Sequence, residues 1–478
     1  MERFNTNPTA KSDRIPRLVE NLYRKMPEIE ADRAVLLTES CQKTEGEPTV
    51  MRRAKAFAHI LAKIPITIRE EELVVGSSTL APRGCQTFPE YSWEWLEAEF
   101  DTIEKRSADP FYISEETKER LRKVHTYWKG KTNSELALSY MAPETVKAME
   151  HNVFTPGNYF YNGVGHVTVH YDKVLEKGLS GIIREAAEEL SRCQVGDADY
   201  ATKHCFLEAV IMSCAAVIGY AERYAALAKR EAEDCADLVR KQELLQIAEN
   251  CSRVPREGAK SFWEACQSFW FIQQLLQMEG SGHSISPGRF DQYMYPYYKK
   301  DLDAGKITRD QAQELIDCIW VKLNDLNKAR DAASAEGFAG YSLFQNLIVG
   351  GQDENGLDVT NDLSFMCIWA SHHVFLPQPS LSIRVWNLTP HELMIEAAKL
   401  TRTGIGLPAY YNDEVIIPSL MNRGLTLEDA RTYNIIGCVE PQKAGKTDGW
   451  HDAAFFNMCR PLEFVFSQGK DRGEQVGA

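Results

Sequence analysis

The sequence predicts an α/β fold built around a largely parallel sheet. Short apolar segments alternate with longer stretches whose apolar residues recur at helical spacing, and this alternation is typical of parallel α/β cores. Apolar residues make up 44% and charged residues 26% of the 478-residue chain, as in ordinary globular proteins. The chain is longer than one ordinary domain, but an α/β barrel can form a single unit of such a length.

Helices dominate the first two-thirds of the chain. Apolar residues recur at helical spacing over residues 173–193 and again from residue 311 onward, where Thr308 can cap the start of the helix. Between these two stretches, residues 206–233 are strongly apolar and end in a charged tail, which predicts a long buried helix.

The predicted strands are short and lie later in the chain, at residues 346–349, 381–386 and 434–436. Each is bounded by Gly, Pro or Asn, and helical patterns separate them. No repeat, low-complexity tract or linker marks a boundary, so we expect a single domain over residues 1–478.

Charge and composition exclude several classes of function. A net charge of −14 argues against partners such as nucleic acids or anionic membranes, which are bound by basic patches. The chain has no run of 18 or more apolar residues and no signal-peptide pattern at its start, so no membrane span is predicted. The glycine pairs do not fit the spacing of phosphate-binding loops, which gives little support to nucleotide binding.

The 12 cysteines contain no C-x-x-C pair, so the spacings of zinc and iron–sulfur sites are absent. Several lie within apolar helical stretches. This usage fits a reducing cytoplasm in which thiols serve as small core residues.

The most informative segment is 434–442, with the sequence NIIGCVEPQ. Pro441 biases Glu440 toward an extended backbone, and residues i and i+2 of an extended chain point to the same face. Cys438 and Glu440 are therefore expected to flank one carbon atom of a small substrate. From spacing alone the simpler interpretation is a buried strand in which Cys438 is a core residue, because free cysteine is often buried.

Three other polar clusters are candidates for the same site. Alternation over 162–170 places His166, Thr168 and His170 on one face, although a lone histidine is more often structural than catalytic. The loop at 282–289 contains the candidates His283 and Ser284. It is equally open that its serines only form hydrogen bonds with the backbone of their own turn. Asp452 follows Cys438 by 14 residues and is equally suited to capping a helix over 453–456.

Together these residues supply a thiol, carboxylates, imidazoles and a hydroxyl, which suits chemistry on the hydroxyl groups of a small polar substrate. The GCVEP motif at 437–441 resembles the cysteine loop of glycyl radical enzymes. Five longer segments narrow the resemblance to the B12-independent glycerol and 1,2-propanediol dehydratases; they are residues 282–298, 345–352, 376–386, 406–418 and 434–452. Pyruvate formate-lyase-like members carry two adjacent cysteines, whereas Val439 follows Cys438 here.

The resemblance implies a ten-stranded α/β barrel with extensive outer helices and with the cysteine loop inside. It implies that Cys438 carries a thiyl radical and Glu440 is the general base. His166 and Asp452 would protonate the leaving hydroxyl. Two further residues would bind substrate hydroxyls, His283 and Ser284. Expected partners are a small diol or triol, a radical S-adenosylmethionine activating enzyme that installs a glycyl radical, and a second copy in a homodimer. No bound metal or cofactor is expected, and the location is the cytoplasm or a bacterial microcompartment.

One departure stands out. The family stores its radical on a glycine in a C-terminal Arg-Val-x-Gly loop, whereas the Arg-Val pair here, Arg384 and Val385, lies in a strand-like segment followed by Trp and Asn. The chain therefore resembles the amino-terminal portion of such an enzyme, incomplete at its C-terminus, and we expect it to be inactive when isolated. Two alternatives stay open: a glycyl radical C–N lyase for another small substrate such as choline, or an inactive fragment that serves as a scaffold.

Overall fold

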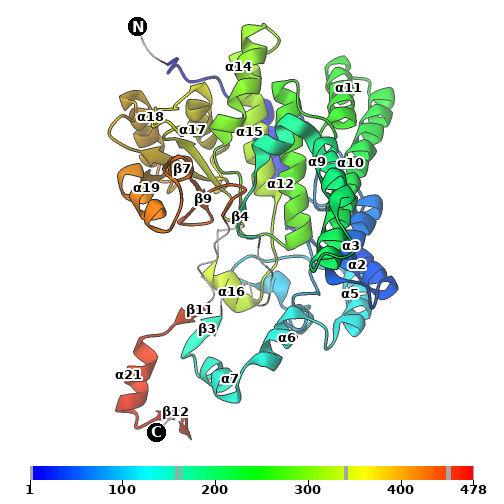
Figure 1. The fold of residues 1–478 in the computed structure, drawn as a ribbon, viewed down its shortest axis with the longest axis vertical. Coiled ribbons are helices and arrows are strands. Elements are labelled where there is room, and N and C mark those ends of the chain that lie inside the picture. Colours follow the sequence, from blue (N-terminus) through cyan, green and yellow to red (C-terminus); the bar gives the residue numbers. More distant parts are fainter. Residues whose placement is uncertain are drawn as a thin grey trace.

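The computed structural model describes residues 4–156, 161, 163, 165–338, 343–447 and 454–476. The amino-terminal helices α2 (Asp32–Lys43), α3 (Thr49–Lys63) and α5 (Glu115–Trp128) pack together at one side of the molecule (Figure 1). Helix α1 (Arg14–Tyr23) packs instead against the later helices α15 (Arg309–Asp325) and α17 (Asp362–Val374). Smaller elements complete this part of the chain: β1 (Ile29–Glu30), β2 (Cys85–Gln86), α4 (Glu94–Ala98), a 3₁₀ turn (Ile103–Lys105), α6 (Asn133–Tyr140) and α7 (Pro143–Glu150).

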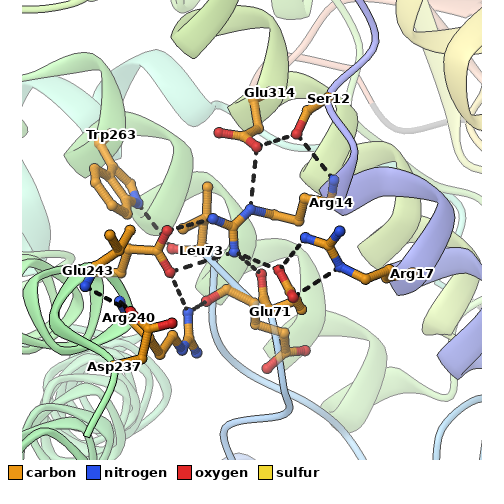
Figure 2. Close-up of polar contacts among 12 residues, drawn as sticks. Ser12, Arg14, Arg17, Glu71, Leu73, Asp237, Arg240, Glu243, Trp263 and Glu314 are labelled. Atoms are coloured by element: carbon orange, nitrogen blue, oxygen red, sulfur yellow. Dashed lines mark hydrogen bonds and ion pairs between the residues drawn. The ribbon is translucent and has the colours of Figure 1, made fainter. Parts of the chain in front are cut away.

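Helix α1 buries Ile15, Leu18 and Leu22 in the core and is also linked to the body by ion pairs, most of them made by Arg14. The Arg14 guanidinium forms ion pairs with Glu71 and Glu314, each at 3.2 Å, and also with Glu243 (Figure 2). Only 13% of the Arg14 side chain is exposed, so these pairs are screened less than surface pairs. They join α1 to α11 (Leu238–Arg253) and α15 (Arg309–Asp325), which lie far apart in the sequence.

The predicted helices are confirmed. The stretch at 173–193 is α9 (Tyr171–Arg192), and the helix after Thr308 is α15, which Thr308 caps through its side chain. The apolar stretch at 206–233 lies in α10 (Tyr200–Asp234), which packs against α3, α9 and α11.

The prediction that the apolar helix is buried holds mainly for its second half. Tyr220 and Tyr224 are fully covered, whereas Phe206 is 56% exposed. α10 has 35 residues, whereas its neighbours α3, α9 and α11 have 15, 22 and 16, so no single neighbour runs along its whole length. By length and composition alone, α10 is also apolar enough to cross a membrane, a test that the core helix of a globular protein passes as well.

The strands are short and mainly parallel, as predicted. β6 (Asn346–Gly350), β7 (Ser380–Val385) and β8 (Ala409–Asn412) form a parallel sheet, and β4 (Val167–Thr168) runs parallel to β5 (Ile285–Ser286). A bridge from Gly288 to Leu347 links the β5 region to β6. β9 (Asn434–Ile436) lies against β4, β5 and β6. The strands thus surround a central segment that begins at residue 434.

Helices between the strands supply the apolar core. α12 (Phe262–Gly280), α15 and α17 (Asp362–Val374) bring together the fully covered rings of Trp270 and Trp320 and the nearly covered ring of Trp369. The remaining helices of this part are α13 (Phe290–Tyr293), α14 (Tyr295–Asp303), α16 (Ala332–Gly337), α18 (His391–Thr401), α19 (Asp413–Asn422) and α20 (Leu427–Arg431). A fully buried ion pair of Arg384 and Asp413 at 2.7 Å joins β7 to α19.

The last described residues form an arm that leaves the body (Figure 1). It contains β11 (Ala454–Phe456), α21 (Cys459–Phe466), β12 (Lys470–Asp471) and β13 (Glu474–Gln475). The helix predicted over 453–456 is wrong for the described residues, because residues 454–456 form a strand that pairs antiparallel with β3 (Phe154–Pro156). Cross-strand pairing, which the local sequence does not reveal, decides the conformation there.

Candidate functional site

Cys438 lies at the tip of a β-hairpin. β9 and β10 (Glu440–Gln442) pair antiparallel with Glu440 opposite Ile436, and residues 437–439 form the turn. The expected continuous extended backbone through Cys438 is therefore wrong, although Glu440 itself is in a strand as Pro441 implies. The physical reason is Gly437, whose φ of 53° lets the chain reverse within three residues.

The hairpin also corrects the simpler interpretation of the motif. Ile435 and Ile436 are fully buried, as that interpretation requires, but Cys438 is exposed among the described residues. The thiol is therefore not a core residue of this strand. The turn presents its side chain outward from the buried hairpin stem.

Three neighbouring strands hold the turn at residues 437–439, which we call the cysteine turn. The Gly437 amide donates to Ser286 Oγ and the Gly437 carbonyl accepts from Asn346 Nδ2, each at 3.1 Å. The Tyr411 hydroxyl donates to the carbonyl of Cys438. Ser286, Asn346 and Tyr411 come from β5, β6 and β8, so the turn is held by its backbone while its side chains are left for other contacts.

Glu440 and His166 form the central polar pair. His166 Nε2 lies 2.7 Å from Glu440 Oε1, and the two side chains are only 6% and 9% exposed. The other carboxylate oxygen of Glu440 accepts from the Val439 amide at 3.2 Å. A buried carboxylate and imidazole in contact can pass a proton between them, which is the arrangement that general acid–base catalysis requires.

His283 and Ser284 lie beside this pair. The His166 amide donates to the carbonyl of His283 at 2.9 Å, and the two imidazole rings are 6.2 Å apart. A β-carbon added to Gly437 would lie 2.8 Å from Ser284 Oγ, so Ser284 borders the cysteine turn. Among the described residues the buried Ser284 hydroxyl has no hydrogen-bond partner, and it is therefore available to a bound molecule.

Burial and charge keep His283 neutral. Desolvation is the main reason that the pKa of His283 lies well below its usual value, and the nearby charges of Arg330, Lys328 and His166 lower it further. A neutral imidazole offers one donor and one acceptor, which suits a hydroxyl group. Burial, with the charges of Cys438 and Glu440, raises the pKa of the Tyr411 hydroxyl to about 12, so Tyr411 stays a donor.

The lowered pKa of His283 predicts a pH dependence of stability. Because the unfolded chain takes up this proton near pH 6.5 and the folded chain does so only at lower pH, His283 weakens folding as the pH falls below about 6.5. Glu30 has the opposite effect, since burial raises its pKa to about 7. The test is therefore a comparison of variants by denaturant unfolding between about pH 5 and 7.

The His283→Gln protein should show a smaller loss of unfolding free energy toward low pH than the wild type. His170→Gln, at an exposed histidine, is the matched control for removing an imidazole. Equal pH slopes for the wild type and His283→Gln would contradict a neutral, buried His283.

The structure brings together five of the six predicted site residues: Cys438, Glu440, His166, His283 and Ser284. Asp452 lies outside the described residues. The expected common face of His166, Thr168 and His170 is wrong for His170, which pairs with Asp172 at 3.2 Å on the surface. The alternation fails because β4 has only two residues and His166 has a φ of 21°.

Sequence reasoning missed the residues that hold the cysteine turn, Ser286, Asn346 and Tyr411. Asn346 and Ser286 lie in segments noted for other reasons, but nothing in the local pattern shows that their side chains contact residue 437. Among the described residues, no group of three or more His, Cys, Asp or Glu side chains is placed to hold a metal ion.

Comparisons with known proteins identify the family to which this chain is similar. Residues 7–478 match the family model described as pyruvate formate lyase-like. The chain is 35% identical to the (2S)-3-sulfopropanediol dehydratase of Klebsiella oxytoca, over 97% of this chain and 57% of that protein. It therefore spans little more than half the length of this relative.

Two solved structures are more similar. A structure reported for 1,2-propanediol dehydration in Roseburia inulinivorans has a TM-score of 0.97 and 70% identity, and it covers 99% of this chain and 57% of its own. The glycerol-bound B12-independent glycerol dehydratase of Clostridium butyricum has a TM-score of 0.95 and 56% identity, with 100% and 60% covered. These matches confirm the predicted barrel fold, and the chain belongs to the pyruvate formate lyase-like family of glycyl radical enzymes.

Proposed function

We propose that these residues form the substrate site of a glycyl radical diol dehydratase, which removes water from propane-1,2-diol or glycerol. The observation that carries the proposal is the buried contact of Glu440 with His166 at 2.7 Å beside the cysteine turn. The identities of 70% and 56% to the two solved structures named above support propane-1,2-diol or glycerol more strongly than the 35% identity to the sulfopropanediol dehydratase supports a sulfonated diol.

The proposal concerns a protein of the full length of these relatives. We assign residues 1–478 to one domain, and we place the radical-storing glycine in a further portion that corresponds to the uncovered part of the relatives. The glycyl radical, once installed by a radical S-adenosylmethionine activating enzyme, would supply unpaired spin to Cys438. The chemistry below is what the residues of this chain do afterwards.

Cys438 begins the reaction by taking a hydrogen atom from C1 of the diol. The C1–H bond breaks, an S–H bond forms, and the unpaired electron moves to C1. A thiol S–H bond and a C–H bond beside a hydroxyl are close in strength, so the transfer is nearly thermoneutral. The cysteine turn presents the sulfur outward, which leaves it accessible to a substrate.

Glu440 then removes the proton of the C1 hydroxyl, which the neighbouring radical has made more acidic. The resulting ketyl expels the C2 hydroxyl, and a proton must reach that oxygen so that water departs. His166 is in contact with Glu440 and can carry the proton from Glu440 to the C2 hydroxyl oxygen. Asp452 is the second proposed acid. His283 and Ser284 would hold the substrate hydroxyls in place during these steps.

The cycle closes when Cys438 returns its hydrogen atom to C2. The product is propanal from propane-1,2-diol or 3-hydroxypropanal from glycerol, and one water is released. Glu440 and His166 end in their starting protonation states because the proton taken from the C1 hydroxyl leaves in the water. The thiyl radical is regenerated, so no external oxidant or reductant is consumed.

A substrate panel tests the proposal. The full-length, activated protein should form an aldehyde from propane-1,2-diol or glycerol, and we expect lower turnover of 3-sulfopropane-1,2-diol. Protein that has not met the activating enzyme is the control and should form no product. Release of trimethylamine from choline without turnover of either diol would replace this proposal with the C–N lyase alternative.

We further propose that the enzyme works in the cytoplasm as a homodimer. Its 12 cysteines are free thiols in the structure, which fits a reducing compartment. Size-exclusion chromatography with light scattering on the full-length protein tests the dimer directly.

A further inference from the structure

Two loops carry three of the candidate site side chains, and both have a backbone that ordinary residues avoid. The first loop comprises residues 281–284. Its φ values are 66° at Ser281, 61° at Gly282, 23° at His283 and 68° at Ser284. A left-handed conformation is unfavourable for a non-glycine residue. Such a conformation persists only where the surrounding structure holds it.

The second loop contains Gly163, Gly165 and His166. Gly163 has a φ of 70° and His166 a φ of 21°. The loop lies directly against the first one, because a β-carbon added to Gly165 would come within 2.4 Å of the side chain of Ile285. The amide of His166 also donates to the carbonyl of His283. A shift of either loop would therefore displace side chains of the other.

Lys328 connects the two loops. It lies just after α15 and is 4% exposed. Its ammonium donates to the carbonyl of Ser281 at 2.8 Å, to Ser281 Oγ at 2.9 Å and to the carbonyl of Gly163 at 3.2 Å. Burial, followed by the charge of Arg330, lowers the pKa of Lys328 well below its usual value, whereas the three oxygen acceptors favour the charged form.

The end of α12 explains why a cation is placed here. The last carbonyls of a helix lack partners within the helix, and cations are favourable beside them. Arg33 donates to the carbonyl of Met278 at 2.6 Å, and Arg53 donates to that of Glu279 at 3.1 Å. Lys328 likewise donates to a carbonyl, that of Ser281, which is the first residue after α12. It also donates to the carbonyl of Gly163 in the second loop.

We propose that Lys328 is a positioning residue of the site. Its ammonium group fixes the loop of Gly163 and His166 against the loop of residues 281–284, and it thereby sets where His166, His283 and Ser284 lie around the cysteine turn. It acts through the two loops and does not contact the reacting atoms. Its kinetic consequence rests on the proposed function, whereas its structural consequence does not.

Substitution of Lys328 by methionine in the full-length enzyme tests the proposal. The variant keeps the long side chain and removes the donors. We expect kcat per glycyl radical, counted by electron paramagnetic resonance, to fall about 100-fold with a smaller change in KM, since a displacement of about 1 Å can cost that much. Lys328→Arg, which keeps a cation with N–H donors, should recover part of the rate.

Lys322→Met is the matched control. Lys322 is an equally buried lysine of α15, but its Nζ contacts Glu72 at 2.6 Å, away from the two loops. Its removal leaves Glu72 as a buried charge without this partner, so the variant should lose stability and keep the wild-type kcat per radical. If kcat falls in Lys328→Met but not in Lys322→Met, the fall therefore cannot be explained by lower stability.

A crystal structure of Lys328→Met provides a measurement that is independent of activity. Displaced His166 and Ser284 side chains would support the positioning role, even if the wild type turned over no diol and the proposed function failed. Wild-type kcat in Lys328→Met, or an equal loss in Lys328→Met and Lys322→Met, would overturn it. If Lys328→Met does not fold, Lys328→Gln is judged by the same criteria.

Discussion

Cys438→Ser is expected to abolish dehydration in the full-length, activated enzyme while leaving the fold intact. A hydroxyl O–H bond is much stronger than a thiol S–H bond, so serine cannot exchange hydrogen atoms with a substrate carbon at a useful rate. The fold should not change, because the contacts of the cysteine turn with Ser286, Asn346 and Tyr411 are made by its backbone. Aldehyde formation in an anaerobic assay measures the effect.

Cys459→Ser is the matched control for this prediction. Cys459 is the other exposed cysteine among the described residues, and it lies in α21, on the arm that leaves the body. Its variant should turn over substrate at the wild-type rate. Dehydration retained by Cys438→Ser, with the radical present at wild-type level, would remove Cys438 from the mechanism.

Glu440→Gln should bind the diol with nearly unchanged affinity and turn it over much more slowly. The amide keeps an oxygen that can accept from the Val439 amide, so the hairpin should form as before. It cannot take up the proton of the C1 hydroxyl, and loss of general base catalysis typically costs about 10²–10⁴ in rate. Steady-state kinetics should therefore show a fall in kcat with KM close to that of the wild type.

Glu264→Gln supplies the comparison for removal of a buried carboxylate elsewhere. Glu264 lies near the start of α12, is 8% exposed and pairs with Arg253. This variant should lose some stability without losing kcat. A wild-type kcat in Glu440→Gln, or an effect on KM alone, would show that Glu440 only binds the substrate.

The sequence predicts the helices and the parallel strands well because their signals are local. The periodic apolar residues of α9 and α15 and the cap at Thr308 act over a few residues, and the structure confirms each. The local sequence at 453–456 indicates a helix, whereas residues 454–456 form a strand because they pair with β3, which lies about 300 residues earlier in the chain. Pairing over such a distance leaves no trace in a short window of sequence.

The same contrast between local signals and long-range contacts applies to the candidate site. Motif and resemblance select Cys438, Glu440, His166, His283 and Ser284, and the structure places all five together. The reversal of the chain at Gly437 could not be foreseen, because Pro441 correctly indicates a strand at Glu440 but gives no information on residues 437–439, which form the turn. The role inferred for Lys328 depends on contacts with residues 281 and 163, which only the folded chain brings near it.

The hairpin of β9 and β10 joins the rest of the molecule through the backbone contacts at its tip, the pair of Glu440 with His166 and the burial of its stem. The residues proposed to bind the substrate, His283 and Ser284, are carried by a separate short segment between α12 and β5. A designer could therefore treat residues 434–442 as an exchangeable cassette and graft the equivalent hairpin of a relative that acts on a different compound. Retuning of substrate preference should then need only a matching change in the adjoining histidine–serine segment, with the helical shell left untouched.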